Sequence, residues 1–220
     1  YCMYTARGII LKREDFRERD ERVFLYTKEF GKMSVVAKGT KRIEAKLRGN
    51  LDIFNFVDII FVEGNNFFIL TGIDTRERFQ DIVKDPYIYG AAVSCARSIA
   101  DIFEENQRDR NLFNFFRKTL KKLHECAQAE DPGLHAWLIQ KKFQMTILEN
   151  QGYSMNAEKI LPDYTKKFSK NSLILLEMLR GAKYSSVRLS RRELWDIEKA
   201  FTDIFEYIFR YRFSSWIPIT

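Results

Sequence analysis

Residues 54–73 read FNFVDIIFVEGNNFFILTGI, two apolar runs separated by Glu63-Gly64-Asn65-Asn66. β-Branched and aromatic residues fill both runs, and the residues between them are of types that form tight turns. The stretch therefore predicts two strands, 54–62 and 67–73, joined as a hairpin. The first run is apolar almost without interruption, which is typical of a strand covered on both faces. A small sheet that curls into a closed barrel covers its strands in this way.

Three more strands are expected on the N-terminal side of this hairpin. Residues 4–13, 23–27 and 33–37 are rich in β-branched and aromatic residues, and Phe30-Gly31-Lys32 provides a turn before the third strand. Five short strands fit the OB-fold barrel.

After about Arg78 apolar residues recur at steps of three and four, which predicts amphipathic helices. Gly152 is the residue type expected just beyond a helix C-terminus, and Ser190 with Glu193 forms the capping-box pattern of a helix start. The expected helices cover 88–103, 112–127, 134–150, 171–180 and 190–208. The expected fold class is α+β, with a five-stranded OB-fold barrel over 1–79 followed by an all-helical domain over 80–220 that packs directly against it.

The composition excludes several classes of protein. The chain of 220 residues has no continuous apolar region near its start and no run of roughly 20 apolar residues, so a cytoplasmic protein is expected. Its three cysteines, Cys2, Cys95 and Cys126, include no CxxC pair, and His124 with Cys126 makes at most half a metal site. No metal or other cofactor is therefore predicted. The formal net charge of +7 makes an anionic partner plausible.

Catalytic motifs are absent, since the sequence contains no GxxxxGK[ST], GxSxG, HExxH or GxGxxG pattern. One enzymatic alternative stays open, a metal-dependent nuclease in which Asp15, Asp20 and Glu21 hold a divalent cation. The arginines interleaved with these acids favour a mixed, solvated loop instead. A second alternative is an OB-fold protein-interaction scaffold that binds no nucleic acid.

The segment 32–48 is strongly basic, with Glu44 as its single acid. Single-stranded nucleic acid is held where cations follow the phosphates and aromatic rings stack on the bases. The segment therefore predicts a DNA-binding surface, although a solvated loop is the alternative interpretation. Four phenylalanines nearby, Phe54, Phe56, Phe67 and Phe68, are expected in the core. The predicted DNA-binding residues are Lys32, Lys38, Lys41, Arg42, Lys46 and Arg48.

Four short stretches follow one another in the first 60 residues: Thr5-x-x-Gly8-Ile9-x-Leu11, Phe30-Gly31-Lys32, residues 37–42 and Leu51-Asp52-Ile53-Phe54. Together they resemble the RecO family of bacterial recombination mediators, in which a GK…AKGARR strand and loop precede an LQPF-like segment. Three later stretches also resemble segments of this family: Lys141-Lys142-Phe143 through Gly152-Tyr153, Phe168-Ser169, and Phe213-Ser214-Ser215. Asp52-Ile53 replaces the middle of the LQPF element, which indicates a divergent member.

The resemblance implies a DNA repair and recombination protein that binds and anneals single-stranded DNA without enzymatic turnover. It also implies that the protein helps load the recombinase RecA together with a RecR-like protein and the C-terminal tail of single-stranded DNA-binding protein. Many family members carry a four-cysteine zinc finger, but residues 153–170 contain no cysteine. The resemblance therefore does not imply a zinc site in this chain.

A partner-peptide site is predicted on the helix expected over 134–150, where Lys141 interrupts an apolar stripe and Lys142 follows it. The tail named above ends in acidic residues, a phenylalanine and a free carboxylate, so it would fit an apolar pocket with a cation at its rim. Two alternatives are that these lysines only reach solvent, or that they add to the DNA-binding surface. The predicted residues of the site are Trp137, Lys141, Lys142 and Met145.

Overall fold

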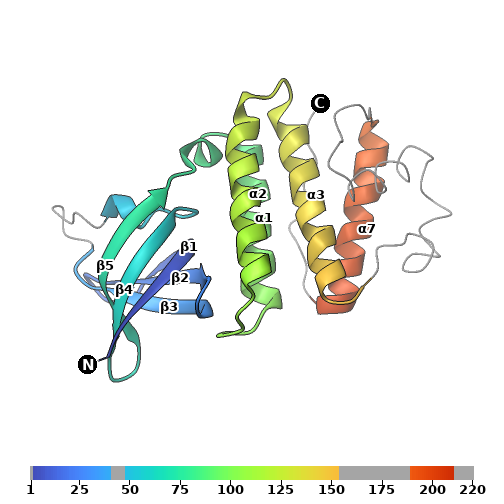
Figure 1. The fold of residues 1–220 in the computed structure, drawn as a ribbon. Coiled ribbons are helices and arrows are strands. Elements are labelled where there is room, and N and C mark those ends of the chain that lie inside the picture. The colour runs from blue at the N-terminus through green and yellow to red at the C-terminus, as the bar shows by residue number, and fades with distance from the viewer. Residues whose placement is uncertain (1, 41–47, 154–188, 211–220) are drawn as a thin grey trace. The chain divides into compact units, whose positions relative to one another are not determined.

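The computed structural model describes residues 2–40, 48–153 and 189–210 (Figure 1). The strands are β1 (Met3–Asp15), β2 (Glu21–Thr27), β3 (Gly31–Ala37), β4 (Phe56–Glu63) and β5 (Phe68–Glu77). The helices are α1 (Pro86–Ile102), α2 (Arg110–Glu125), α3 (Pro132–Asn150) and α7 (Arg191–Phe209), with short 3₁₀ turns η1 (Arg48–Asn50), η2 (Gln80–Val83) and η3 (Cys126–Gln128). The α+β class is confirmed. The helix predicted over 171–180 lies outside the described residues.

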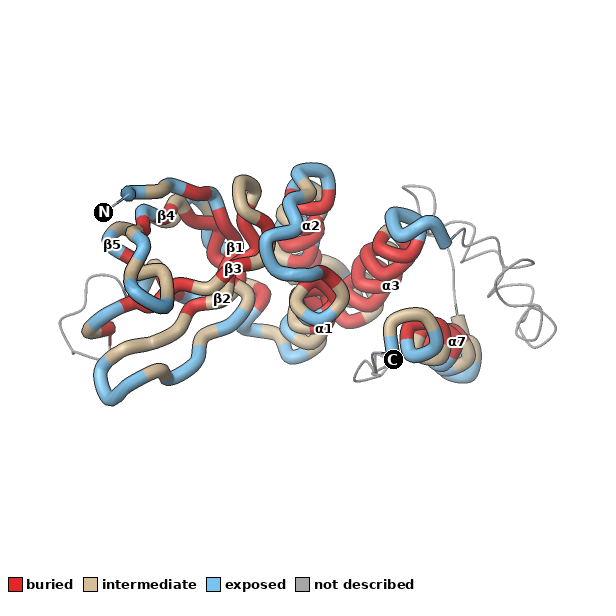
Figure 2. Tube along the Cα trace, turned by 90° about the horizontal axis from the view of Figure 1, so that it is seen from below, coloured by how far each residue is buried: buried red, intermediate tan, exposed pale blue. Residues whose placement is uncertain are grey.

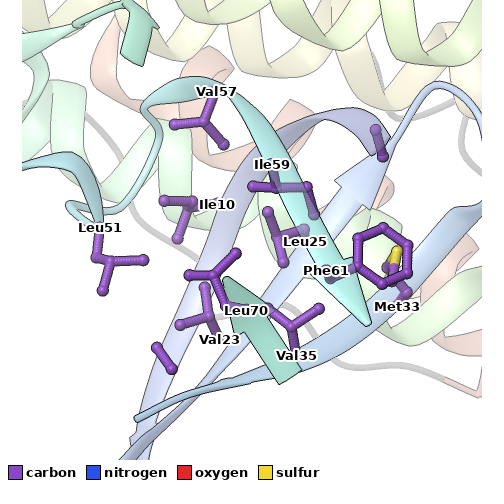
Figure 3. Close-up of a cluster of buried hydrophobic side chains, with 12 residues drawn as sticks. Ile10, Val23, Leu25, Met33, Val35, Leu51, Val57, Ile59, Phe61 and Leu70 are labelled. Atoms are coloured by element: carbon purple, nitrogen blue, oxygen red, sulfur yellow. The ribbon is translucent and has the colours of Figure 1, made fainter. Parts of the chain in front are cut away.

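The five strands pair in a closed circuit, in the order β1-β2-β3-β5-β4 and back to β1. Neighbouring strands are antiparallel except β3 and β5, which are parallel and pair through residues 35–37 and 68–70. Buried and exposed positions largely alternate along the strands, so the circuit has an apolar interior (Figure 2). Figure 3 shows Ile10, Leu25, Val35, Ile59 and Phe61 of this interior, contributed by four different strands. A small five-stranded sheet of this kind is the architecture of the OB fold.

The described chain divides into two compact units, and the domain boundary expected at residue 79 stays a prediction. The first unit comprises residues 1–81 and 96–124, and therefore joins the strands to the second half of α1 and to α2. The second unit comprises residues 82–95 and 125–220, with α3 and α7. Part of the helical sequence thus belongs to the same body as the strands.

Aromatic contacts and an ion pair attach α2 to the strands within the first unit. The Phe113 ring lies 6.0 Å from those of Tyr26 and Phe56. The Arg117 guanidinium lies 4.6 Å from the Phe56 ring centroid and pairs with Glu77 at the end of β5. The Asp109 carboxylate accepts the first amides of the helix, from Asn111 and Leu112, which is the usual action of an N-cap.

The loop between α1 and α2 extends the sheet beside β3. Glu105 and Lys32 form a parallel bridge, and the Asn106 amide donates to the Lys32 carbonyl at 3.1 Å. Gly31 has φ = +71°, and a Cβ atom at this position would lie 2.2 Å from the Gln107 carbonyl oxygen. The loop can approach β3 this closely only because residue 31 is glycine.

In the second unit, the buried residues of α3 lie on nearly all sides of the helix (Figure 2), so α3 is its central helix. Its Gln140 donates to Ser94 of α1, and its Trp137 donates to Glu198 of α7. The two predicted helix ends are confirmed, since Gly152 follows α3 with φ = +85° and Ser190 forms a capping box with Glu193. Among the described residues, no helix is long and apolar enough to cross a bilayer.

Candidate nucleic-acid interface

The outer face of β1, β2 and β3 places cationic and aromatic side chains in adjacent rows. Because successive residues of a strand point to opposite faces, Arg22 and Phe24 point outward while Val23 and Leu25 enter the core. Phe24 is paired across the sheet with Lys12 on one side and Ser34 on the other. The Lys12 ammonium lies 5.9 Å from the Phe24 ring centroid and also pairs with Glu14.

Two loops form the rim of this face. Phe16, in the turn between β1 and β2, meets Phe67, in the turn between β4 and β5, with ring centroids 5.3 Å apart and nearly perpendicular planes. The Arg17 guanidinium lies 5.2 and 5.7 Å from these two ring centroids, and that of Arg22 lies 4.5 Å from Phe16. Both rings are only partly buried. We call Phe16, Arg17, Arg22, Phe24 and Phe67 the rim cluster.

The backbone holds these loops in place. The Phe16 amide donates to the Asp20 carbonyl at 3.1 Å, and the Gly64 amide donates to the Phe67 carbonyl at 3.0 Å. The Asp20 carboxylate accepts the Gly39 amide at 2.9 Å, which ties the exit of β3 to the same turn. The rim cluster and the chain that leaves β3 therefore form one continuous edge of the fold.

This arrangement suits a single strand of nucleic acid. In OB folds the face of the second and third strands and the loops after the first and fourth strands are where oligonucleotides bind. Partly exposed rings offer surfaces on which unpaired bases can stack, and guanidinium groups beside them can pair with phosphates.

Two other arginines of the strands, Arg7 on β1 and Arg76 on β5, are engaged in ion pairs. Arg7 pairs with Glu29 at 2.8 Å, and Arg76 pairs with Asp58 at 2.6 Å. The β2–β3 side is the better candidate because it combines cations with partly exposed aromatic rings.

The predicted basic segment is only partly described. Lys38 is exposed and follows β3 directly, next to the Asp20–Gly39 contact. Arg48 begins η1. The positions of Lys41, Arg42 and Lys46 lie outside the described residues.

Lys32 has a structural contact instead of a free side chain. Its ammonium donates to the Ala100 carbonyl in the last turn of α1, and its backbone pairs with the loop after that helix. A cation at a helix C-terminus also interacts favourably with the helix dipole. Lys32 thus joins β3 to α1, whereas Lys38, just beyond β3, is exposed.

The rim cluster was missed by the sequence analysis, which placed Phe67 in the core and Arg17 and Arg22 in a solvated acidic–basic loop. A signal was present in the alternation of Arg22, Val23, Phe24 and Leu25, but the expected strand began only at Val23. The meeting of Phe16 with Phe67 joins residues far apart in the sequence, so no local pattern could reveal it.

The acidic residues considered for a nuclease are engaged in other contacts. Glu21 pairs with Arg13 at 2.8 Å, and Asp20 accepts the Gly39 amide. Within residues 2–40, 48–153 and 189–210, no three His, Cys, Asp or Glu side chains are grouped so that they could hold a metal ion. Nothing in this geometry favours phosphodiester hydrolysis.

The predicted partner-peptide residues lie mostly in the interior of the second unit. Trp137 and Lys141 are 0% exposed and Met145 is 2% exposed, so the prediction that Lys141 lies at the rim of a surface pocket is wrong. The Lys141 ammonium contacts the Glu198 carboxylate at 2.6 Å and the Gln144 amide oxygen at 2.9 Å. Lys142 is half-buried.

The surroundings of Lys141 explain why a charge is tolerated there. Burial lowers the pKa of Lys141 from its ordinary value, and the Glu198 carboxylate opposes that shift. The ammonium also lies 5.6 Å from the Trp137 ring centroid and 5.2 Å from that of Phe201. This buried pair links α3 to α7.

Comparison with known proteins agrees with the fold. Residues 3–79, which include β1 to β5, match the family model described as Recombination protein O N terminal. Three similar proteins are each named DNA repair protein RecO. That of Clostridium novyi is 24% identical over 157 residues, or 71% of this chain and 59% of the relative. That of Clostridium acetobutylicum is 26% identical over 173 residues (77% and 64%), and that of a Thermoanaerobacter species is 31% identical over 123 residues (56% and 50%).

The chain thus spans about three fifths of the length of these curated relatives. The strands carry the match to the family model, and the similarity to the relatives continues beyond them into the helices. Residues 3–79 are thus similar to the N-terminal domain of RecO proteins, and the chain as a whole is similar to DNA repair proteins named RecO.

Proposed function

We propose that this protein is a cytoplasmic recombination mediator that binds single-stranded DNA and anneals complementary strands without enzymatic turnover. The observation that carries the proposal is the rim cluster, in which Arg17 and Arg22 lie over the Phe16 and Phe67 rings beside the β2–β3 face. Its combination of rings and guanidinium groups matches the chemistry of single-strand binding. The names of the relatives, which are DNA repair proteins, support the same conclusion.

In this proposal the strand continues from the rim cluster along the chain that leaves β3. Lys38 is exposed at that exit. The basic residues that follow it in sequence, Lys41, Arg42, Lys46 and Arg48, stay predicted DNA-binding residues on their charge alone.

Charge reversal of Arg22 and Lys38 tests the electrostatic part of the proposal. Each phosphate contact on a single strand contributes about 0.7 to the slope of log affinity against log salt, so this double variant is expected to flatten the slope by about 1.4. Fluorescence anisotropy of a labelled oligonucleotide measures both affinity and slope, and annealing of complementary strands is expected to slow in parallel.

The matched control is charge reversal of Arg7 on β1 and Arg76 on β5, which changes the net charge equally but at positions outside the rim cluster. Replacement of Phe67 by alanine tests stacking separately, with an expected loss of about 1–3 kcal/mol of binding free energy. If the Arg22/Lys38 variant and the Arg7/Arg76 control bind with equal affinity and slope, DNA does not follow the rim cluster. Parent protein that binds no single strand at all would support the alternative of an interaction scaffold.

We further propose a RecR-like protein and the C-terminal tail of single-stranded DNA-binding protein as partners, which the similarity to RecO proteins supports. Because Trp137, Lys141 and Met145 are buried, the tail is expected to bind elsewhere on the chain. Titration of the tail peptide into parent protein and into a Lys142→Glu variant tests what remains of the original site. Equal affinities would remove helix α3 from consideration.

A further inference from the structure

The first half of β1 is paired with a strand on only one side. Residues 3–9 pair with β4, whereas the pairing with β2 begins at Gly8 and continues to Asp15. Among the described residues, no strand pairs with residues 3–7 on the side away from β4. This stretch is therefore an open edge in the circuit of strands, and an open edge is a template on which another strand can pair.

Hydrogen bonds at Arg7 show which backbone groups face the open edge. The Arg7 amide donates to the Glu29 carboxylate at 2.8 Å, and the Arg7 carbonyl accepts the Lys28 amide at 2.9 Å. Both groups of Arg7 therefore point away from β4. Since alternate residues of an antiparallel pair face the same side, the N–H and C=O groups of Met3 and Thr5 point to the open edge as well.

The backbone groups of Met3 and Thr5 are available for pairing. Met3 is 69% exposed, and Thr5 is exposed too. Within residues 2–40, 48–153 and 189–210, no strand, loop or side chain bonds to these groups on the open side. At Arg7 the Glu29 carboxylate already fills the place of a strand partner. A strand added to this edge thus pairs with residues 3–5 and ends beside Glu29.

The inner side of the open edge leaves two aromatic rings incompletely covered. Tyr4 and Phe30 pack against the core of the strands, with ring centroids 6.2 Å apart, and both are only partly buried. Every second side chain of an added strand lies on this side. An apolar side chain there covers the two rings, and removal of their apolar surface from water favours binding.

The outer side of the open edge borders a hollow of about 450 Å³. Thr5 of β1 lines this hollow together with Ile60 of β4, which is 39% exposed. The charged residues that line it form two ion pairs, Arg7 with Glu29 and Arg76 with Asp58. Because these charges balance, the hollow suits an uncharged side chain better than an acidic or a basic one.

We propose that the open edge at residues 3–5 binds an extended, uncharged segment of a partner protein as an additional β-strand. Main-chain hydrogen bonds to Met3 and Thr5 supply the affinity, and the alternate side chains of the segment supply the specificity. One side chain covers Tyr4 and Phe30, and its neighbour enters the hollow on the outer side. None of these residues belongs to the rim cluster, so the edge binds its segment independently of DNA.

The probe for this site is the synthetic peptide acetyl-Ser-Val-Thr-Val-Ser-amide, which is uncharged and alternates in polarity. Titration into the isotope-labelled full chain is expected to shift the amide resonances of Met3 and Thr5 until they saturate. Hydrogen exchange tests the edge itself. In the free protein the Thr5 amide is expected to exchange fast and the Ala6 amide, which faces β4, slowly, and the peptide is expected to slow exchange at Thr5.

Replacement of Thr5 by proline removes the N–H group at the centre of the edge. Proline is tolerated on an edge strand where the N–H group faces solvent, so Thr5→Pro is expected to fold, which circular dichroism checks. Loss of this donor is expected to weaken peptide binding about tenfold. The matched control, Thr5→Val, keeps the N–H group and is expected to bind as the parent does. If Thr5→Pro does not fold, Met3→Pro removes the other donor at the first residue of β1.

The proposal is upheld if the peptide saturates the parent and Thr5→Val and binds the folded proline variant more weakly. It is overturned if the parent shows no saturable shift, if both variants bind equally, or if the Thr5 amide of the free protein exchanges as slowly as that of Ala6. A dimer in light scattering that the proline variant dissociates also overturns it, because a second copy of the chain then occupies the edge. Single-strand binding by the same proteins is expected to be unchanged, and its absence in the parent refutes only the proposed function.

Discussion

Gly31 and Gly39 give an internally controlled test of how the loop after α1 is held against β3. Both glycines have positive φ, +71° and +67°. A Cβ at Gly39 would meet no atom within 4 Å, whereas at Gly31 it would lie 2.2 Å from the carbonyl oxygen and 2.6 Å from the carbonyl carbon of Gln107. Replacement of each glycine by alanine therefore imposes the same backbone strain, but only Gly31→Ala also forces the loop away.

The expected magnitudes follow from these contacts. Placing alanine in the left-handed region costs about 1–2 kcal/mol, which is the whole expected loss for Gly39→Ala. Gly31→Ala also displaces Gln107, which weakens the Asn106–Lys32 hydrogen bond and the contact of Tyr26 with the Asp109 carbonyl. At about 0.5–1.5 kcal/mol for each bond, the total for Gly31→Ala is about 2–5 kcal/mol.

Urea unfolding followed by far-ultraviolet circular dichroism measures the free energy of unfolding of both variants. Hydrogen exchange of the peptide that contains Asn106 locates the change, with faster exchange expected for Gly31→Ala and parent-like exchange for Gly39→Ala. Equal losses of stability together with equal exchange at Asn106 would refute the reasoning, because the close approach of Gln107 would then contribute nothing.

Two further predictions concern buried groups of the second unit. Replacement of Lys141 by methionine leaves the Glu198 carboxylate buried without its cation and is expected to cost about 3–5 kcal/mol of unfolding free energy. Combining it with Glu198→Leu is expected to restore most of that loss. Urea unfolding monitored by tryptophan fluorescence checks this, and a double variant no more stable than the single one would contradict it. Burial raises the pKa of the Cys126 thiol to about 12 and that of Cys95 as well, so at pH 8 iodoacetamide is expected to modify exposed Cys2 first and the other two only after denaturation. Mass spectrometry that finds Cys95 modified in the native protein as fast as Cys2 would be inconsistent with its burial.

Local patterns carried enough information to predict most of the secondary structure. The apolar runs around the turn at 63–66 form β4 and β5, and the spacing of three and four after Arg78 forms the helices. Gly152 and Ser190 marked helix ends because capping depends on a few neighbouring residues and on little else. The resemblance to RecO proteins, strongest in the first 60 residues, was likewise visible in the sequence and is confirmed by the family model over residues 3–79.

Tertiary contacts decided the roles of the charged and aromatic residues. Lys32 appears in sequence as one more cation of a basic segment, yet its ammonium bonds to Ala100, which lies far along the chain. Lys141 appears as a break in an apolar stripe, yet Glu198 makes its burial possible. Phe16 and Phe67 become a candidate binding surface only when the closed circuit of strands brings their two turns together.

The physical reason is one of range. Backbone periodicity and capping arise within a few residues, so the sequence by itself determined the strands, the helices and their ends. Burial and ion pairing depend on which distant groups surround a side chain, and a charge is exposed, paired or buried only after the chain has folded. The sequence therefore determined that this protein has an OB-type sheet and amphipathic helices, whereas only the tertiary structure decided that Arg17 and Arg22 lie beside the Phe16 ring while Lys32 and Lys141 hold the fold together.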